Sequence, residues 1–307
     1  MGAPVSLIRV ESPQEEIAEP ISQALQLIDF SHEGPVELVS IKPNLCYYWD
    51  AATGYTTDPR VVAWIIDYTR QRYGEDATMR IVESDATAMK TKYTFPALRY
   101  DTLAKEKDVE LFNLSNDRVE KKTVNVNGLE LAFRVPQSLL ESDLFINVPK
   151  LKTMRATGIT CAMKNIFGCI ASPRKIIYHE FLAEAIVGIN KILRPHLTIV
   201  DGLIGLGRHP AKLGLLMASV DPFSIDWVAS QIMGYTPSDI GFLRIAAKEK
   251  LGTPEGMKTE GEDIRAFKEL FPRESLLHSK LWDIQLWLLN AYNKIVKDVI
   301  PPELERT

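Results

Sequence analysis

Lysine and asparagine side chains follow directly after apolar runs at separate places in the chain. The run at 35–41 (PVELVSI) is followed by Lys42 and Asn44. The run at 143–148 (DLFINV) contains Asn147 and is followed by Lys150 and Lys152, and Lys164 and Asn165 come shortly afterwards. These residues are Lys42, Asn44, Asn147, Lys150, Lys152, Lys164 and Asn165. Several such donors around one anion bind it through charge-assisted hydrogen bonds. The pattern therefore predicts a site for a phosphate or carboxylate group.

Acidic residues lie at comparable positions. Glu83 follows an expected strand at 79–82, Asp201 follows an expected strand at 197–200, and Asp226 lies early in an expected helix. Such carboxylates could pair with the lysines, move protons, or bind Mg²⁺ or another hard divalent cation, which prefers oxygen ligands. For Asp226, charge complementarity in the first turn of the helix is an alternative. The sequence does not select a metal.

These side chains divide into two groups of candidates. The candidate catalytic residues are Lys152, Lys164, Glu83 and Asp226, and the candidate binding residues are Lys42, Asn44, Asn147, Lys150, Asn165 and Asp201. A lysine crowded by other cations can have a lowered pKa and act as a base or as a Schiff-base nucleophile. The sequence does not choose between that role and simple binding.

Alternating strand and helix patterns would bring these residues together. They predict an α/β fold with a mostly parallel sheet flanked by helices. The carboxyl ends of parallel strands share one edge of the sheet, where ligands bind in open α/β folds. Asn127-Gly128 predicts a β-hairpin of 119–126 and 129–135, placed at the sheet edge. The segment 203–213, rich in glycine, is expected to be a loop, and one helix is expected to start at Pro96.

Composition shifts after residue 250 divide the chain into two parts. We expect an α/β domain at 1–250, and a linker with a helical tail at 251–307. An apolar stripe at 275–300 has helical spacing and could dock on the chain itself, on a second copy in a homodimer, or on a membrane surface.

The composition limits the classes of partner. Hydrophobic residues make up 46% of the chain, charged residues 25%, and the formal net charge is -4, which argues against nucleic acid. The tail is too charged to be a transmembrane segment. The first residues show no export signal, so we expect a cytoplasmic protein.

Three cysteines are too few and too scattered for a disulfide framework. Buried free thiols are the first interpretation. The alternative is an iron–sulfur cluster held by Cys46, Cys161 and Cys169, all of which lie in or near the stretches that carry the candidate residues.

Six motifs in order resemble one family. They are IKPNL (41–45), TTDPRVV (56–62), INVPKLKT (146–153), AMKNIFG (162–168), IVDG (199–202) and ASVDPFSIDWVASQIMG (218–234). Together they resemble the domain of unknown function 362 family. The resemblance implies an α/β domain with a shared site but no established reaction. The matching positions are Lys42, Asn44, Asp58, Asn147, Lys150, Lys152, Lys164, Asn165, Asp201 and Asp226.

Members of that family are often described alongside iron–sulfur proteins, and many carry a ferredoxin-like module. This sequence contains no such module, and Cys46 and Cys169 fall where the family pattern does not require cysteine.

Three functions stay open at this point. The leading hypothesis is an enzyme that acts on a small anionic metabolite. The second is a redox protein with a cluster or with a separate ferredoxin-like electron donor. The third is a non-catalytic binding or scaffold protein that uses its helical tail.

Overall fold

The computed structural model describes residues 1–11, 18–86 and 89–273. Its main sheet contains ten strands. They are β1 (Val5–Arg9), β2 (Leu38–Pro43), β3 (Thr78–Glu83), β4 (Glu110–Asn113), β7 (Leu144–Val148), β8 (Lys150–Met154), β9 (Gly158–Thr160), β10 (Leu197–Leu206), β11 (Pro210–Ser219) and β12 (Thr259–Gly261).

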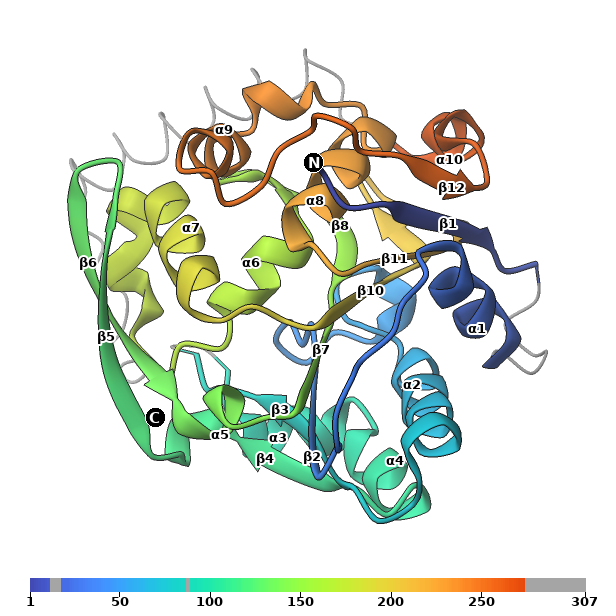
Figure 1. Cartoon of the computed structure of the whole chain (residues 1–307), viewed down its shortest axis with the longest axis vertical. Coiled ribbons are helices and arrows are strands. Elements are labelled where there is room, and N and C mark those ends of the chain that lie inside the picture. Colours follow the sequence, from blue (N-terminus) through green and yellow to red (C-terminus); the bar gives the residue numbers. More distant parts are fainter. Residues whose placement is uncertain (12–17, 87–88, 274–307) are drawn as a thin grey trace, which may run out of the picture. The chain divides into compact units, whose positions relative to one another are not determined.

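The strand order is β12-β1-β11-β10-β7-β2-β3-β4, with β8 paired to β10 and β9 (Figure 1). The five strands from β10 to β4 run parallel. β11 is antiparallel to both β10 and β1. The predicted mostly parallel α/β fold is therefore confirmed.

Helices cover both faces of this sheet (Figure 1). The α-helices are α1 (Ala18–Leu27), α2 (Pro59–Tyr73), α3 (Thr91–Ala97), α4 (Tyr100–Glu106), α5 (Gln137–Leu140), α6 (Ala162–Phe167), α7 (Leu182–Ile192), α8 (Pro222–Ile232), α9 (Gly241–Lys248) and α10 (Ile264–Leu270). The 3₁₀ turns are η1 (Ala51–Thr53), η2 (Leu114–Asn116), η3 (Lys175–Phe181) and η4 (Pro237–Asp239).

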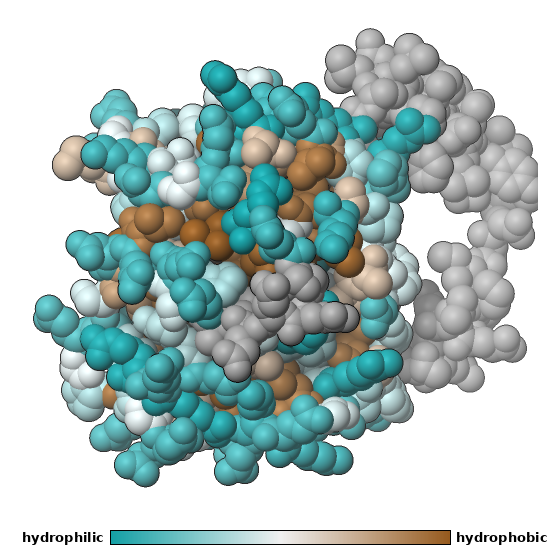
Figure 2. Space-filling model, turned by 90° about the vertical axis from the view of Figure 1, so that its right-hand side faces the viewer, coloured by the Kyte–Doolittle hydropathy of each residue, from teal (hydrophilic) through white to brown (hydrophobic). Residues whose placement is uncertain are grey.

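Alternate side chains of each strand enter different cores. Leu144 and Ile146 of β7 pack in the cluster formed with α1, α2, α3 and α4. Phe145, between them in sequence, packs in the cluster formed with α6 to α10. This period of two is the reason that both faces of the sheet must be covered by helices. Figure 2 shows the side that carries α1, α2 and α10, where hydrophilic side chains cover most of the surface and hydrophobic ones show between them.

Local sequence signals explain where the main helices begin and end. The Asp58 side chain accepts a hydrogen bond from the Arg60 amide at the start of α2, and Pro59 follows it. Asp221 caps α8 in the same way and also precedes a proline. Gly74, at a φ of 97°, ends α2.

Two local predictions were wrong. The helix expected to start at Pro96 begins at Thr91, and the left-handed Arg99 (φ 62°) divides the region into α3 and α4. The glycine-rich segment 203–213 is mostly strand, because β10 and β11 extend through it. Its glycines serve packing instead: a Cβ on Gly205 would lie 2.5 Å from the Leu213 side chain.

The predicted hairpin is present as β5 (Val119–Val126) and β6 (Leu129–Pro136), with positive φ at Asn127 and Gly128. It forms a separate two-stranded sheet and does not extend the edge of the main sheet. It packs on α7, where Gly188 leaves room for Phe133: a Cβ at that glycine would lie 2.9 Å from the phenyl ring.

The first compact unit of the chain runs from Met1 to Pro272, past the expected boundary at residue 250. β12 pairs with β1, and Phe267 of α10 is completely buried. The segment TEG that forms β12 has no apolar alternation, so its strand could not be read from the sequence. The expected helical tail at 275–300 lies outside the described residues.

Candidate functional site

The sheet register brings the predicted residues to one edge. Lys42 at the end of β2 lies opposite Asn147 of β7, and Lys150 of β8 lies opposite Asp201 of β10. Glu83 ends β3, the other neighbour of β2. Residues far apart in the sequence therefore meet at the carboxyl edge of the parallel strands.

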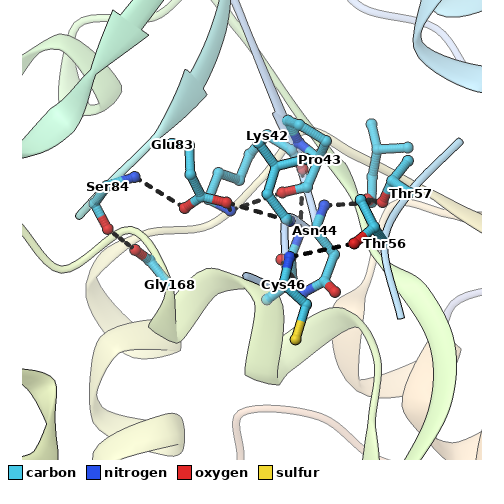
Figure 3. A network of polar contacts seen from close by, with 12 residues as sticks. Lys42, Pro43, Asn44, Cys46, Thr56, Thr57, Glu83, Ser84 and Gly168 are labelled. Carbon is cyan, nitrogen blue, oxygen red and sulfur yellow. Dashed lines mark hydrogen bonds and ion pairs between the residues drawn. The ribbon is translucent and has the colours of Figure 1, made fainter. Parts of the chain in front are cut away.

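Lys42 and Glu83 form a buried ion pair. The Lys42 Nζ lies 2.8 Å from Glu83 Oε2 and also donates to the Pro43 carbonyl at 2.7 Å (Figure 3). The other Glu83 oxygen accepts the Ser84 amide. Both side chains are almost inaccessible to solvent. The pair is electrically neutral and leaves Lys42 little freedom to bind a ligand.

Gly168, directly after α6, lies beside this pair. Its carbonyl accepts a hydrogen bond from the Ser84 hydroxyl (Figure 3). A Cβ at Gly168 would lie 2.9 Å from the Asn165 carbonyl oxygen, so this close turn of the backbone excludes a side chain.

Lys150 and Asp201 form a second buried pair. Their Nζ and Oδ2 atoms are 2.8 Å apart, and the side chains are 1% and 0% exposed. The Asp201 carboxylate also accepts the backbone amides of Asp58 at 2.8 Å and Leu203 at 3.0 Å. Like the first pair, it contributes no net charge.

Three asparagines tie α6 to the sheet. Asn44 donates to the Asn165 side-chain oxygen at 3.0 Å, and Asn165 donates to Asn147 at 2.8 Å and to the Lys42 carbonyl at 3.1 Å. Asn147 in turn donates to the Ala162 carbonyl at 3.2 Å. The predicted binding amides thus connect β2, β7 and α6 to one another.

Asp226 supports α6 from the opposite side. Its two oxygens accept the amides of Ala162 at 2.6 Å and Met163 at 2.9 Å, the first two residues of that helix. Burial raises the pKa of this carboxyl to about 7, while the two amide hydrogen bonds lower it. The structure therefore places Asp226 at the N-terminus of α6, bonded to its backbone, and Lys164 is the next residue of the helix.

The remaining lysines have no carboxylate partner among the residues that the structure describes. Lys152 donates to Asn44 Oδ1 and to the Tyr55 carbonyl, both at 2.7 Å. Lys175 donates to the Ser84 hydroxyl at 2.6 Å and to the Asp85 carbonyl at 2.7 Å. Lys164 has no hydrogen-bond acceptor within the described ranges, and its Nζ lies 4.5 Å from the centre of the Phe167 ring.

Lys175 was not among the site residues predicted from the sequence. It follows no apolar strand, since it opens η3, and it reaches the site through bonds to residues about 90 positions earlier in the chain. A signal was nevertheless present, because its partners Ser84 and Asp85 directly follow the strand that ends in Glu83.

Burial lowers the pKa of each of the three unpaired cations. It lowers the pKa of Lys164 to about 8, and the charges of Lys152 and Lys175 contribute to that lowering. It lowers the pKa of Lys175 to about 8 as well, where the Glu83 carboxylate opposes the effect and Lys42 adds to it. The pKa of Lys152 is lowered by burial and by Lys150, while Cys46 opposes the effect. An incoming anion would offset this repulsion and the lost hydration.

Aromatic residues border the lysines. Tyr47, Tyr48 and Trp49 are 45%, 44% and 45% exposed in the loop after β2. The Trp49 ring lies 4.3 Å from that of Tyr55, whose carbonyl holds Lys152. The same loop therefore supplies both an acceptor for a site lysine and an exposed aromatic surface.

The cysteines occupy different environments. Cys161 and Cys169 are completely buried, and burial raises the pKa of the Cys169 thiol to about 12 and that of Cys161 well above its ordinary value. Cys46 is partly exposed, and its sulfur points away from the Lys42–Glu83 pair (Figure 3). In the part of the chain that is described, no three His, Cys, Asp or Glu side chains form a group able to hold a metal ion.

A hollow of about 880 Å³ has none of the site lysines in its lining. The lining includes Arg194, just before β10, and Asp221, just after the antiparallel β11, both at the amino end of β10. Met163 of α6 also lines it.

The described fold and site can be compared with known proteins. The family model described as domain of unknown function 362 matches residues 39–231, and the chain belongs to this family. A thylakoid-associated protein of Synechocystis is 27% identical over 232 residues, which cover 71% of this chain and 69% of the relative.

One solved structure resembles the fold distantly. It is the lactate racemase apoprotein of Thermoanaerobacterium thermosaccharolyticum, with a TM-score of 0.39, 11% identity, and coverage of 75% of this chain. The present chain spans 57% of that protein, and a likeness at this level carries no argument about function.

No helix within the described ranges is long and apolar enough to span a membrane. The cytoplasmic location, the ferredoxin-like donor, the iron–sulfur cluster, the divalent cation and the homodimer stay predictions from the sequence.

Proposed function

We propose that this protein is an enzyme that acts on a small metabolite bearing a phosphate or carboxylate group. The observation that carries the proposal is the cluster of Lys152, Lys164 and Lys175, three ammonium groups without a carboxylate partner in the described part of the chain. The chain as a whole carries a formal charge of -4, so this positive cluster is a local feature.

The roles within the site follow from the contacts. Lys152 and Lys175 are fixed by two neutral acceptors each, so they present oriented charges to an anion. The pairs Lys42–Glu83 and Lys150–Asp201 hold the strand ends in place. Lys164 is partly exposed and donates no hydrogen bond in the described part of the chain, and its Nζ lies 4.5 Å from the centre of the Phe167 ring. Groups with perturbed pKa values gather at functional sites, which favours an enzyme over a passive binder.

Removal of one site cation should abolish stabilisation by anions. We expect sulfate, phosphate and small carboxylates to raise the melting temperature of the wild-type protein, because a ligand that binds only the folded state stabilises it. Lys175→Gln should lose most of this shift. The matched control is Lys121→Gln, an exposed lysine on β5, which should keep it. Differential scanning fluorimetry measures both, and a wild-type protein that responds to none of these anions would contradict the proposal.

Anion affinity should fall as the pH rises. Lys164 and Lys175 have pKa values of about 8, so both are mostly charged at pH 7 and mostly neutral at pH 9. Sulfate keeps its charge over this pH range, so any change in its affinity reports the protonation of the protein alone. We expect sulfate affinity to drop by about tenfold or more between pH 7 and pH 9. Isothermal titration calorimetry at several pH values tests this, and an affinity that is constant or rises would assign the binding to other groups.

A further inference from the structure

The site lysines differ in whether their amines are held by fixed acceptors. A nucleophilic amine needs a lone pair that is free to reach the carbonyl carbon, and an amine held by fixed acceptors must first break those hydrogen bonds. Lys42 and Lys150 each donate to a carboxylate, and both are 1% exposed. Lys152 and Lys175 each donate to two oxygens and are buried. The amines of these four lysines are therefore tied to fixed acceptors.

Lys164 is the exception within the described part of the chain. It donates to no acceptor there, and it is partly exposed while the other four are buried. Its helix is fixed by Asp226, which accepts the first amides of α6, and by Asn165, which donates to β2 and β7. The amine thus lies within the electrostatic reach of Lys152 and Lys175, and its lone pair is available on deprotonation.

The neighbouring cations would place a substrate for such an amine. A carboxylate or phosphate held by Lys152 and Lys175 would bring the carbon next to it towards Lys164. The same cations repel a proton on Lys164, which together with burial gives its pKa of about 8. At neutral pH the neutral fraction is then about two orders of magnitude larger than for an ordinary lysine. One arrangement thus serves both binding and activation.

From this geometry, and resting on the function proposed above, we propose that Lys164 forms an imine with the carbonyl group of a small anionic ketone or aldehyde. The amine lone pair attacks the carbonyl carbon, and the C=O electron pair moves to oxygen, which takes up a proton. The resulting carbinolamine takes up a second proton at oxygen and loses water, while the nitrogen loses one proton on forming the C=N⁺ bond. The overall change is amine plus carbonyl compound plus one proton to iminium ion plus water. The iminium ion is an electron sink for bonds at the carbon next to it.

Reductive trapping tests this inference. The full-length protein is incubated at pH 8 with pyruvate, 2-oxoglutarate or glyceraldehyde 3-phosphate, then treated with sodium borohydride, which delivers hydride to an imine carbon. We expect one adduct per chain with at least one of these probes. Its mass gain equals the probe plus two hydrogens less one water, and peptide mapping should locate it at Lys164. Excess sulfate should lower the yield by competing for Lys152 and Lys175.

The variant Lys164→Arg separates the two proposals, because arginine keeps the positive charge but is not a nucleophile. It should retain stabilisation by sulfate and lose the adduct, whereas Lys121→Arg on the hairpin should retain both. If sulfate stabilises the wild-type protein but no probe gives an adduct at Lys164, the imine is refuted and the anion site stands. If sulfate gives no stabilisation, the anion site itself fails. The peptide map of the wild-type protein decides the question even if the arginine variant does not fold.

Discussion

Asp201→Asn is expected to destabilise the protein by about 3 to 5 kcal/mol, the usual cost of removing one partner of a buried ion pair. The substitution keeps the size of the side chain but removes its charge. The Lys150 ammonium, 1% exposed, would then have no compensating carboxylate at 2.8 Å. Asparagine also has one acceptor oxygen where aspartate has two. The backbone amide of either Asp58 or Leu203 would therefore point at the side-chain NH2 group of the asparagine, which is itself a donor. Chemical denaturation gives the free energy of unfolding.

The control for this experiment is Asp76→Asn, because Asp76 is exposed at the surface. It should change the free energy of unfolding by less than about 0.5 kcal/mol. Adding Lys150→Met to Asp201→Asn should recover part of the loss, since the unpaired charge is removed. A loss below about 1 kcal/mol for Asp201→Asn alone would show that the pair does not hold the edge of the sheet.

The second large effect is expected at Glu83. Glu83→Gln leaves the buried Lys42 ammonium without a compensating charge, and one oxygen must replace the two that accept from Lys42 and from the Ser84 amide, so we expect a loss of about 3 to 5 kcal/mol. The double variant Lys42→Met, Glu83→Gln should be more stable than Glu83→Gln, because it no longer buries an isolated charge. Equilibrium denaturation of the two single variants and the double variant gives the coupling energy.

A surface ion pair of similar geometry provides the matched comparison. Arg80 and Glu110 lie 2.6 Å apart on neighbouring strands, but their side chains are 25% and 57% exposed. Glu110→Gln should cost less than about 1 kcal/mol, because water screens the charges. If both glutamine variants had the same small cost, burial would not be what makes the Lys42–Glu83 pair important.

Much of the site followed from local sequence. An apolar run that leads into Lys42, or into Asn147 and Lys150, marks a strand end, and parallel strands share one carboxyl edge. What local sequence cannot supply is the pairing of charges across strands. Lys42 and Lys150 resemble Lys152 in their sequence settings, yet the first two have carboxylate partners and the third does not. Partner choice depends on register and on which helix covers which strand end.

The other differences have similar causes. Lys175 was missed because it reaches the site through a 3₁₀ turn outside any strand. Asp226 could have served the ligand or the helix, and only the fold shows its carboxylate bonded to the amides of Ala162 and Met163. The packing of α10 on the domain depends on Phe267 and Phe271, two apolar residues in a charged segment, which is too weak a pattern to predict burial.

Pro149 separates β7 from β8, and this interruption of the strand determines which segments a bound ligand would stabilise. Before it, β7 pairs with both β2 and β10; after it, β8 pairs with β10 and not with β2, and the Pro149 carbonyl accepts the Asp201 amide. After the last backbone bond between the two strand ends, from the Asn44 amide to the Val148 carbonyl, side-chain bonds such as that from Lys152 to Asn44 connect β8 to the segment after β2. A ligand bound to Lys152 would therefore strengthen the connection between β8 and the segment after β2. We expect slower amide hydrogen exchange in both of these segments when the ligand is bound.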